Sequence, residues 1–155
     1  MRLTSIRSAP EEWKEKAAYI DTLLLPIYGF QLQNKEPELS ELEAVDRISA
    51  QIERELTGRL LLLPPIAYVG KNPSTLHKYI QEVISTFIEA QFHHFFLIYP
   101  EGRIMEEELQ LESLPFQVTL LPVTLKPSLA EDPATLTPIA ESLRNKIVQR
   151  WMNGN

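Results

Sequence analysis

The chain of 155 residues contains no cysteine, and this absence removes a whole class of chemistry. No disulfide, thiolate nucleophile or thiolate metal site can form without it, which agrees with a reducing cytoplasmic environment. Histidine is nearly as scarce, with three residues, and none of them has the HExxH spacing of a zinc hydrolase. The sequence also lacks the glycine spacing of a P-loop or dinucleotide-binding loop, and the GxSxG turn of a serine hydrolase. Several common signatures of catalysis are therefore missing.

Long apolar stretches and excess positive charge are missing too. A transmembrane helix needs about 18 or more continuous apolar residues, and no segment approaches that length. Residues 1–20 carry Glu11, Glu12 and Glu15 where the apolar core of a signal peptide would lie. The formal net charge of -6 repels a nucleic-acid backbone and an anionic lipid surface. We therefore expect a cytoplasmic protein that binds neither nucleic acid nor membrane.

Proline, in contrast, is plentiful, and it interrupts four apolar runs. These are LLLPI at 23–27, LLLLPPI at 60–66, FFLIYPEG at 95–102 and VTLLPV at 118–123. Because proline cannot donate a hydrogen bond to a neighbouring strand, the pattern predicts four strands, of which the first three end at their proline. The last run keeps its strand-like pattern beyond Pro122, which favours an edge strand.

Helical periodicity fills the segments between these runs. Apolar residues at spacings of three and four predict a helix that begins at Ser40. Ser40 and Glu43 fit a capping box at its start, and Gly58 fits the left-handed residue that ends a helix. A second helix is predicted after Asn72 and Pro73, which suit the N-cap and the first turn.

Two further helices are predicted near the ends of the chain, a short one over residues 10–18 and a long one that begins at 132–133 or at 137–138. Continuous apolar strands that alternate with helices are typical of a sheet covered on both faces. The sequence thus predicts a single α/β domain over residues 1–155. We expect a three-layer sandwich in which a mainly parallel sheet of about four strands is flanked by helices.

Ligands of open α/β sheets bind outside the carboxyl ends of the strands, so the residues after each apolar run are the candidates for a site. The candidate ligand-binding residues are Tyr28, Tyr68, Lys71, Asn72, Ser74, Glu101 and Arg103. Lys71, Asn72 and Ser74 lie where the amino end of a helix favours an anion, although Asn72 and Ser74 also fit plain helix caps. Glu101 and Arg103 fit either substrate binding or a mutual ion pair across a turn.

Metal and catalytic sites receive no assignment. His93 and His94 are adjacent, so on a strand they point to opposite faces, and His77 falls on the predicted second helix. We interpret all three as structural or surface residues. The acidic run at 106–108 is typical of a solvated turn. The sequence therefore indicates no catalytic residue, metal ligand or cofactor.

The run LLLLPPIAYVG, followed by a helix and then by HHFFLIYPEGR, resembles the core of the creatininase family of metal-dependent amidohydrolases. That resemblance implies an α/β fold. Gln31, Gln33 and Asn34 occupy the region where the family has a glutamate and a histidine that bind metal, and residues 100–103 replace its glycine- and histidine-rich loop. The resemblance thus supports the fold and weakens a catalytic role.

The segment AAYIDTLLLPI, residues 17–27, together with the chain length, resembles the YpiF-like family of small bacterial proteins found in bacilli, which has no assigned function. That resemblance implies a cytoplasmic protein. Together the features favour a noncatalytic domain that acts through a protein partner, through self-association or by binding a small ligand at the strand ends. Trp13, Trp151 and Met152 are candidates for an exposed apolar patch that would hold a partner. The alternatives are a divergent creatininase-like hydrolase, and anion or nucleotide binding at the amino end of the second helix.

Overall fold

The apolar runs form the strands of a parallel sheet. The computed structural model describes residues 1–125 and 133–154. The strands of the main sheet are β1 (Thr22–Gly29), β4 (Leu60–Leu62), β5 (Ile66–Tyr68), β6 (His94–Pro100) and β7 (Gln117–Val123). All of their pairings are parallel, and the order is β4-β1-β6-β7, with β5 pairing with β1 beyond the end of β4. The predicted α/β class and the mainly parallel sheet are confirmed, and β7 is the edge strand that the sequence favoured.

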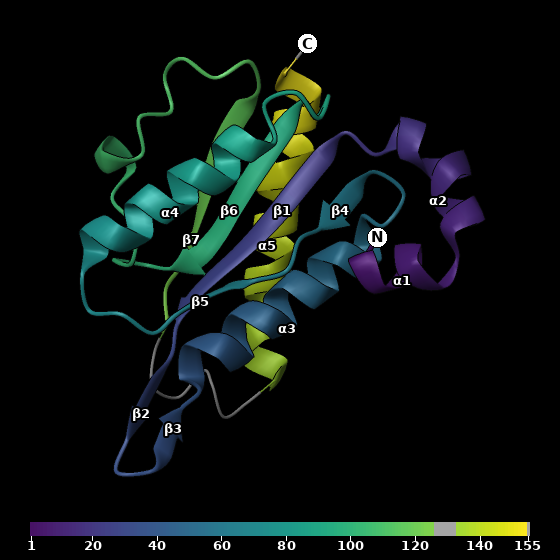
Figure 1. Cartoon of the computed structure of the whole chain (residues 1–155). Helices are drawn as coiled ribbons and strands as arrows, with labels where there is room; N and C mark the ends of the chain where they lie inside the picture. Colours follow the sequence, from purple (N-terminus) through teal and green to yellow (C-terminus); the bar gives the residue numbers. More distant parts are fainter. Residues whose placement is uncertain (126–132, 155) are drawn as a thin grey trace.

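Helices cover both faces of this sheet (Figure 1). The helices are α1 (Leu3–Ser8), α2 (Pro10–Lys16), η1 (Ala17–Tyr19), α3 (Ser40–Glu55), α4 (Pro73–Thr86), η2 (Glu106–Glu108) and α5 (Pro133–Asn153). Leu24 and Phe96 point into a core shared with α3 and α5, whereas Leu23 and Phe95 point into a core shared with α4. Successive strand residues are therefore buried on opposite faces, which explains why the runs are continuously apolar. The three-layer arrangement is the one that the sequence predicted, and none of the helices in the part of the chain described here is long and apolar enough to span a membrane.

Pro26 corrects the prediction that the first strand ends at its proline. β1 continues to Gly29, and Pro26 pairs in register with Ile98 of β6. The Leu24 carbonyl accepts a hydrogen bond from the Leu63 amide at 2.9 Å. The backbone nitrogen of Pro26, two residues further on, therefore points to the same side of β1. The neighbouring chain is interrupted there by Pro64 and Pro65, between β4 and β5. The position of Pro26, which has no amide proton, therefore faces the break between β4 and β5.

The amino end of α3 also differs from the prediction. The Ser40 side chain does not cap the helix, because its hydroxyl donates to Oε1 of Glu38 at 2.5 Å. The same carboxylate oxygen accepts the Ser40 amide at 3.1 Å, so the acidic group before the helix takes the role given to Ser40 and Glu43. Gly58 is not left-handed, and the helix ends earlier, at Glu55. The predicted capping box and glycine stop are therefore wrong.

The cap of α4 is confirmed, since the Asn72 side chain accepts the Ser74 amide at 3.0 Å. At the other end of the chain, α5 is already helical at Pro133, so the later start at 137–138 is wrong, and Asp132 lies outside the described residues. The short amino-terminal helix falls over Pro10–Lys16, within the predicted range, and is preceded by α1, which the sequence did not predict.

A small antiparallel hairpin extends from the carboxyl end of β1 (Figure 1). It consists of β2 (Gln31–Gln33) and β3 (Glu36–Glu38), and its turn residues Asn34 and Lys35 have φ angles of 51° and 63°. All of its residues are exposed, so no apolar pattern marked it in the sequence. The hairpin places Gln31 at the edge of the site described next.

Candidate ligand-binding site

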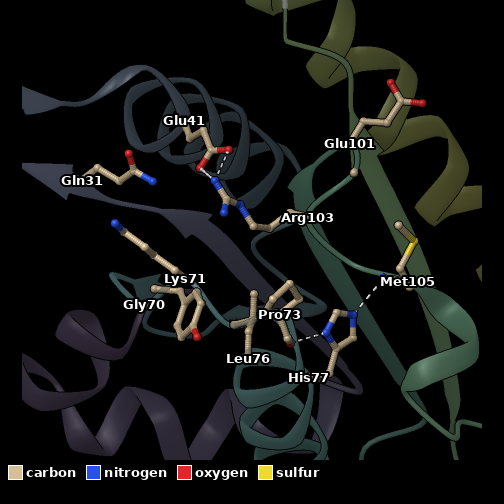
Figure 2. Close-up of a pocket in the computed structure, with 12 residues that line it drawn as sticks. Gln31, Glu41, Gly70, Lys71, Pro73, Leu76, His77, Glu101, Arg103 and Met105 are labelled. Atoms are coloured by element: carbon tan, nitrogen blue, oxygen red, sulfur yellow. Dashed lines mark hydrogen bonds and ion pairs between the residues drawn. The ribbon is translucent and has the colours of Figure 1, made fainter.

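A cavity of about 450 Å³ opens at the carboxyl ends of the strands, where the topology predicted a site (Figure 2). It is lined by Gln31, Glu41, Tyr68, Gly70, Lys71, Pro73, Leu76, His77, Glu101, Gly102, Arg103 and Met105. These residues come from the hairpin, the first turn of α3, the segment from β5 into α4, and the loop after β6. A volume of this size suits a small molecule.

Four of the seven candidate residues line the cavity: Tyr68, Lys71, Glu101 and Arg103. Asn72 and Ser74 do not line it, and they form the cap of α4 instead. Tyr28 lies on the other face of β1, in the core shared with α3 and α5, with 4% of its surface exposed. Burial raises the pKa of its phenol, and the charge of Asp46 acts in the same direction.

Arg103 pairs with Glu41 and not with Glu101. Its Nη2 donates to both carboxylate oxygens of Glu41 at 2.8 Å, and Oε2 of Glu41 also accepts the Gly29 amide at 2.6 Å. Gly29 is required at this point, because a Cβ atom built there would lie 2.6 Å from Cζ of Arg103 and 2.7 Å from Oε2 of Glu41. Glycine at the end of β1 thus makes room for an ion pair that joins α3 to the loop after β6.

Glu101 has a different partner, the Thr124 hydroxyl, which donates to its Oε2 at 2.9 Å. Its side chain extends away from Lys71 and from the guanidinium of Arg103 (Figure 2). Of the two alternatives drawn from the sequence, the ion pair across the turn between Glu101 and Arg103 is therefore excluded. Gly102, between them, has a φ of 86°, which the turn after β6 requires.

Lys71 is the lining cation that has no carboxylate partner among the residues that the structure describes. Its ammonium group makes no ion pair and no hydrogen bond with residues 1–125 or 133–154. The side chain extends towards Gln31 across the mouth of the cavity (Figure 2). The backbone that carries Lys71 is fixed by Tyr68, whose hydroxyl donates to the Asn72 carbonyl at 2.5 Å. The phenol ring folds over Gly70, where a Cβ atom would lie 2.6 Å from Cζ of Tyr68.

His77 closes the floor of the cavity and is a structural histidine. Its Nδ1 lies 2.6 Å from the Pro73 carbonyl, and its Nε2 accepts the Met105 amide at 2.9 Å (Figure 2). Since a carbonyl needs a donor and an amide needs an acceptor, this geometry selects the neutral ring with its proton on Nδ1. The ring ties the first turn of α4 to the loop after β6. Both ring nitrogens of His77 thus contact the backbone of the protein itself.

Several lining residues were not among the candidates. Gln31 lies just beyond β1, after Phe30, so the strand-end argument covers its position. No local pattern in the sequence marks Glu41, because it lies in the helix after the hairpin and its partner Arg103 is 62 residues away in the sequence. His77 fell on the predicted second helix and was interpreted as a structural or surface residue, and Leu76 directly precedes it there.

The donor atoms present do not form an obvious metal cage. Among the described residues, no group of three or more histidine, aspartate or glutamate side chains is close enough to hold an ion. Gln31, Gln33 and Asn34, which stand in the region of the creatininase metal ligands, are exposed on the hairpin. The chemistry that this cavity offers is thus charge and hydrogen bonding from Lys71, Arg103 and Gln31.

Comparison with known proteins gave two matches. A family described as "Protein of unknown function (DUF2487)" matches residues 11–149. The chain is also similar to the uncharacterized protein YpiF of Bacillus subtilis (strain 168), with 31% identity over 91 residues. The aligned part covers 57% of this chain and 59% of the relative, so the match spans less than two thirds of that protein.

Proposed function

The chain belongs to the DUF2487 family, in agreement with the resemblance of residues 17–27 to the YpiF-like family, and we propose that its cavity binds a small organic anion. We further propose that the protein senses this ligand and does not convert it. The observation that carries the proposal is Lys71, a cation without a carboxylate partner among the described residues, at the mouth of a cavity at the strand ends. An unpaired cation beside a cavity is most readily satisfied by an anion.

Two cationic side chains, and not the first two residues of α4, are suited to hold this anion. The amino end of α4 adds the favourable field of its dipole. However, Pro73 has no amide proton, and the Ser74 amide is already taken by Asn72. Arg103 adds N–H groups that Glu41 does not use, because Glu41 binds Nη2 alone. Leu76 and Pro73 provide apolar wall for the remainder of the ligand.

A sensing role is supported by the state of the acid–base groups in the cavity. A general base needs a free lone pair within reach of the substrate. Both nitrogens of His77 are engaged, Glu41 is paired with Arg103, and Glu101 accepts the Thr124 hydroxyl and extends away from Lys71 and Arg103. None of these contacts favours hydrolysis, and no observation favours the creatininase-like alternative.

A cytoplasmic location forms part of the proposal, supported by the net charge of -6 and by the lack of cysteine. The apolar patch expected near the termini has less support. Trp13 and Trp151 are packed against the two cores, and Met152 remains exposed at 75%. A protein partner or self-association therefore stays a prediction, which sedimentation analysis at high protein concentration would test.

The test of ligand binding is a thermal-shift screen of the chelator-treated protein with acetate, phosphate, adenosine monophosphate and manganese at constant ionic strength. A ligand at a hundred times its Kd adds about 2.7 kcal/mol to the free energy of unfolding, which moves the Tm by roughly 5 to 11 °C. We expect one or more of the anions to raise the Tm, and Lys71→Met to abolish the shift.

Lys78→Met is the matched control. Lys78 lies on α4, shortly after Lys71. It is exposed, does not line the cavity and has no ion pair among the described residues, so its variant loses the same charge elsewhere. If both variants lost the Tm shift equally, the shift would depend only on the net charge of the protein, which would contradict the proposal. A shift with manganese that survives Lys71→Met would point to the hydrolase instead.

A further inference from the structure

We infer that the cavity selects anions with a single negative charge, carboxylates foremost, over dianions such as sulfate and phosphate monoesters, and that Glu41 sets this preference. The inference rests on the proposed function, since it concerns the same cavity and the same cations. It follows from how the charges that line the cavity are already paired.

One lining cation, Lys71, lacks a counter-charge within residues 1–125 and 133–154. Lys71 and Arg103 are cationic and Glu41 is anionic, whereas Glu101 extends away from both cations and accepts the Thr124 hydroxyl. Arg103 already has Glu41 as its counter-charge at 2.8 Å. A bound monoanion therefore neutralises Lys71, whereas a dianion leaves one negative charge without a partner.

Arg103 can bind a second carboxylate without giving up the first. Both oxygens of Glu41 accept from Nη2, which leaves Nε and Nη1 without a partner in the part of the chain described here. These N–H groups lie in the plane of the guanidinium, and a planar carboxylate matches that edge. A guanidinium between two carboxylates is electrostatically satisfied by the first one, so the second adds hydrogen bonds more than charge.

Glu41 cannot easily withdraw when a ligand binds. Its Oε2 accepts the Gly29 amide at 2.6 Å, and its backbone belongs to the first turn of α3. Its side chain is 22% exposed, so water screens its charge only in part. The negative charge of Glu41 thus remains beside any bound anion, and each extra charge on that anion is repelled. Because the screening is partial, we expect a preference of about tenfold in Kd rather than many orders of magnitude.

The test compares probes that differ in charge but little in shape. Methanesulfonate and sulfate share a tetrahedral sulfur, but the first is a monoanion and the second a dianion, and acetate adds the planar carboxylate. Titration calorimetry at constant ionic strength should show the wild-type chain binding acetate and methanesulfonate about tenfold more tightly than sulfate. In Glu41→Gln, the ratio of the sulfate Kd to the methanesulfonate Kd should fall about tenfold, because the repelling charge is gone while the amide oxygen can still accept from Gly29.

Glu43→Gln is the matched control, because it removes one negative charge from the same turn of α3 at a residue that does not line the cavity. It should keep the wild-type ratio. The inference is overturned if sulfate binds the wild-type chain as tightly as methanesulfonate, or if both glutamate variants change the ratio equally. In either case the Lys71→Met result still decides the proposed function. If acetate, methanesulfonate and sulfate all fail to bind, both the inference and the proposed function are overturned. Each ratio compares two Kd values of the same variant, so a loss of stability in Glu41→Gln does not obscure it. The wild-type ratio also tests the inference without any variant.

Discussion

His94 is buried at the start of β6 with 6% of its surface exposed. Its ring stacks on Phe96, and its Nδ1 has no hydrogen-bond partner in residues 1–125 and 133–154. Burial lowers the pKa of this imidazole below its ordinary value of 6.5. The charges of Arg59 and His93 act in the same direction, and that of Asp21 opposes them. The folded state therefore holds His94 neutral at a pH where the unfolded chain already takes up a proton.

The sign of the resulting pH dependence follows from that difference. Because the pKa of His94 is lower in the folded state, its contribution is fully present above about pH 6.5, and stability is lost as the pH falls below that value. We expect His94→Phe to make the free energy of unfolding less steep between about pH 7 and pH 5, measured by urea denaturation. His93→Gln, at the exposed neighbour, removes only the smallest cause of the lowered pKa of His94 and should change the slope far less. An unchanged slope in His94→Phe would assign the effect to another group.

Helices and strands were predictable where packing against the neighbouring layers sets the spacing of the apolar residues. α3 and α4 show helical spacing because each presents one stripe to the sheet, and β1 and β6 are continuously apolar because both faces are covered. The ends of these elements were less predictable. The position of Pro26 inside β1 depends on a break in the neighbouring strand, and the start of α3 depends on Glu38, which competes for Ser40.

The candidate site was predictable to the same degree. Lys71, Glu101 and Arg103 follow directly after strands, and the parallel topology brings strand ends together. Glu41 was missed because its position is fixed by a contact between two distant elements, and no local pattern records that contact.

The carboxyl end of α5 is attached to the sheet by a small network. The Trp151 indole donates to the buried Thr22 hydroxyl at 2.9 Å, that hydroxyl donates to Asp21 at 2.8 Å, and the guanidinium of Arg59 lies 4.2 Å from the centre of the indole ring. Trp151→Phe should lower the free energy of unfolding by about 1 to 2 kcal/mol, through the lost hydrogen bond and the smaller ring. Met152→Leu, at the exposed next residue, should change it by less than about 0.5 kcal/mol in the same urea denaturation. Equal effects would show that the network does not hold the helix.

The two tryptophans lie on opposite sides of the sheet, which makes them reporters of the two outer layers. Trp13 of α2 packs against the core shared with α4, and Trp151 of α5 packs against the core shared with α3. Both cores are built on the same strands, since alternate residues of β1 and β6 belong to each. Loss of one layer would expose one whole face of the sheet, so neither layer is expected to persist without the other.

We therefore propose that residues 1–155 form one domain that unfolds in a single transition. Trp13→Phe leaves Trp151 as the fluorescent reporter of one layer, and Trp151→Phe leaves Trp13 as the reporter of the other. Within each variant, the urea midpoint from tryptophan fluorescence should coincide with the midpoint from far-ultraviolet circular dichroism, and both should give the same slope with urea. If the hydrogen bond of Trp151 to Thr22 contributes more stability than the packing of Trp13, the midpoint of Trp151→Phe should be the lower of the two. A fluorescence transition that precedes the dichroism transition in one variant would instead show that its layer unfolds independently, and that the sheet is stable with one face uncovered.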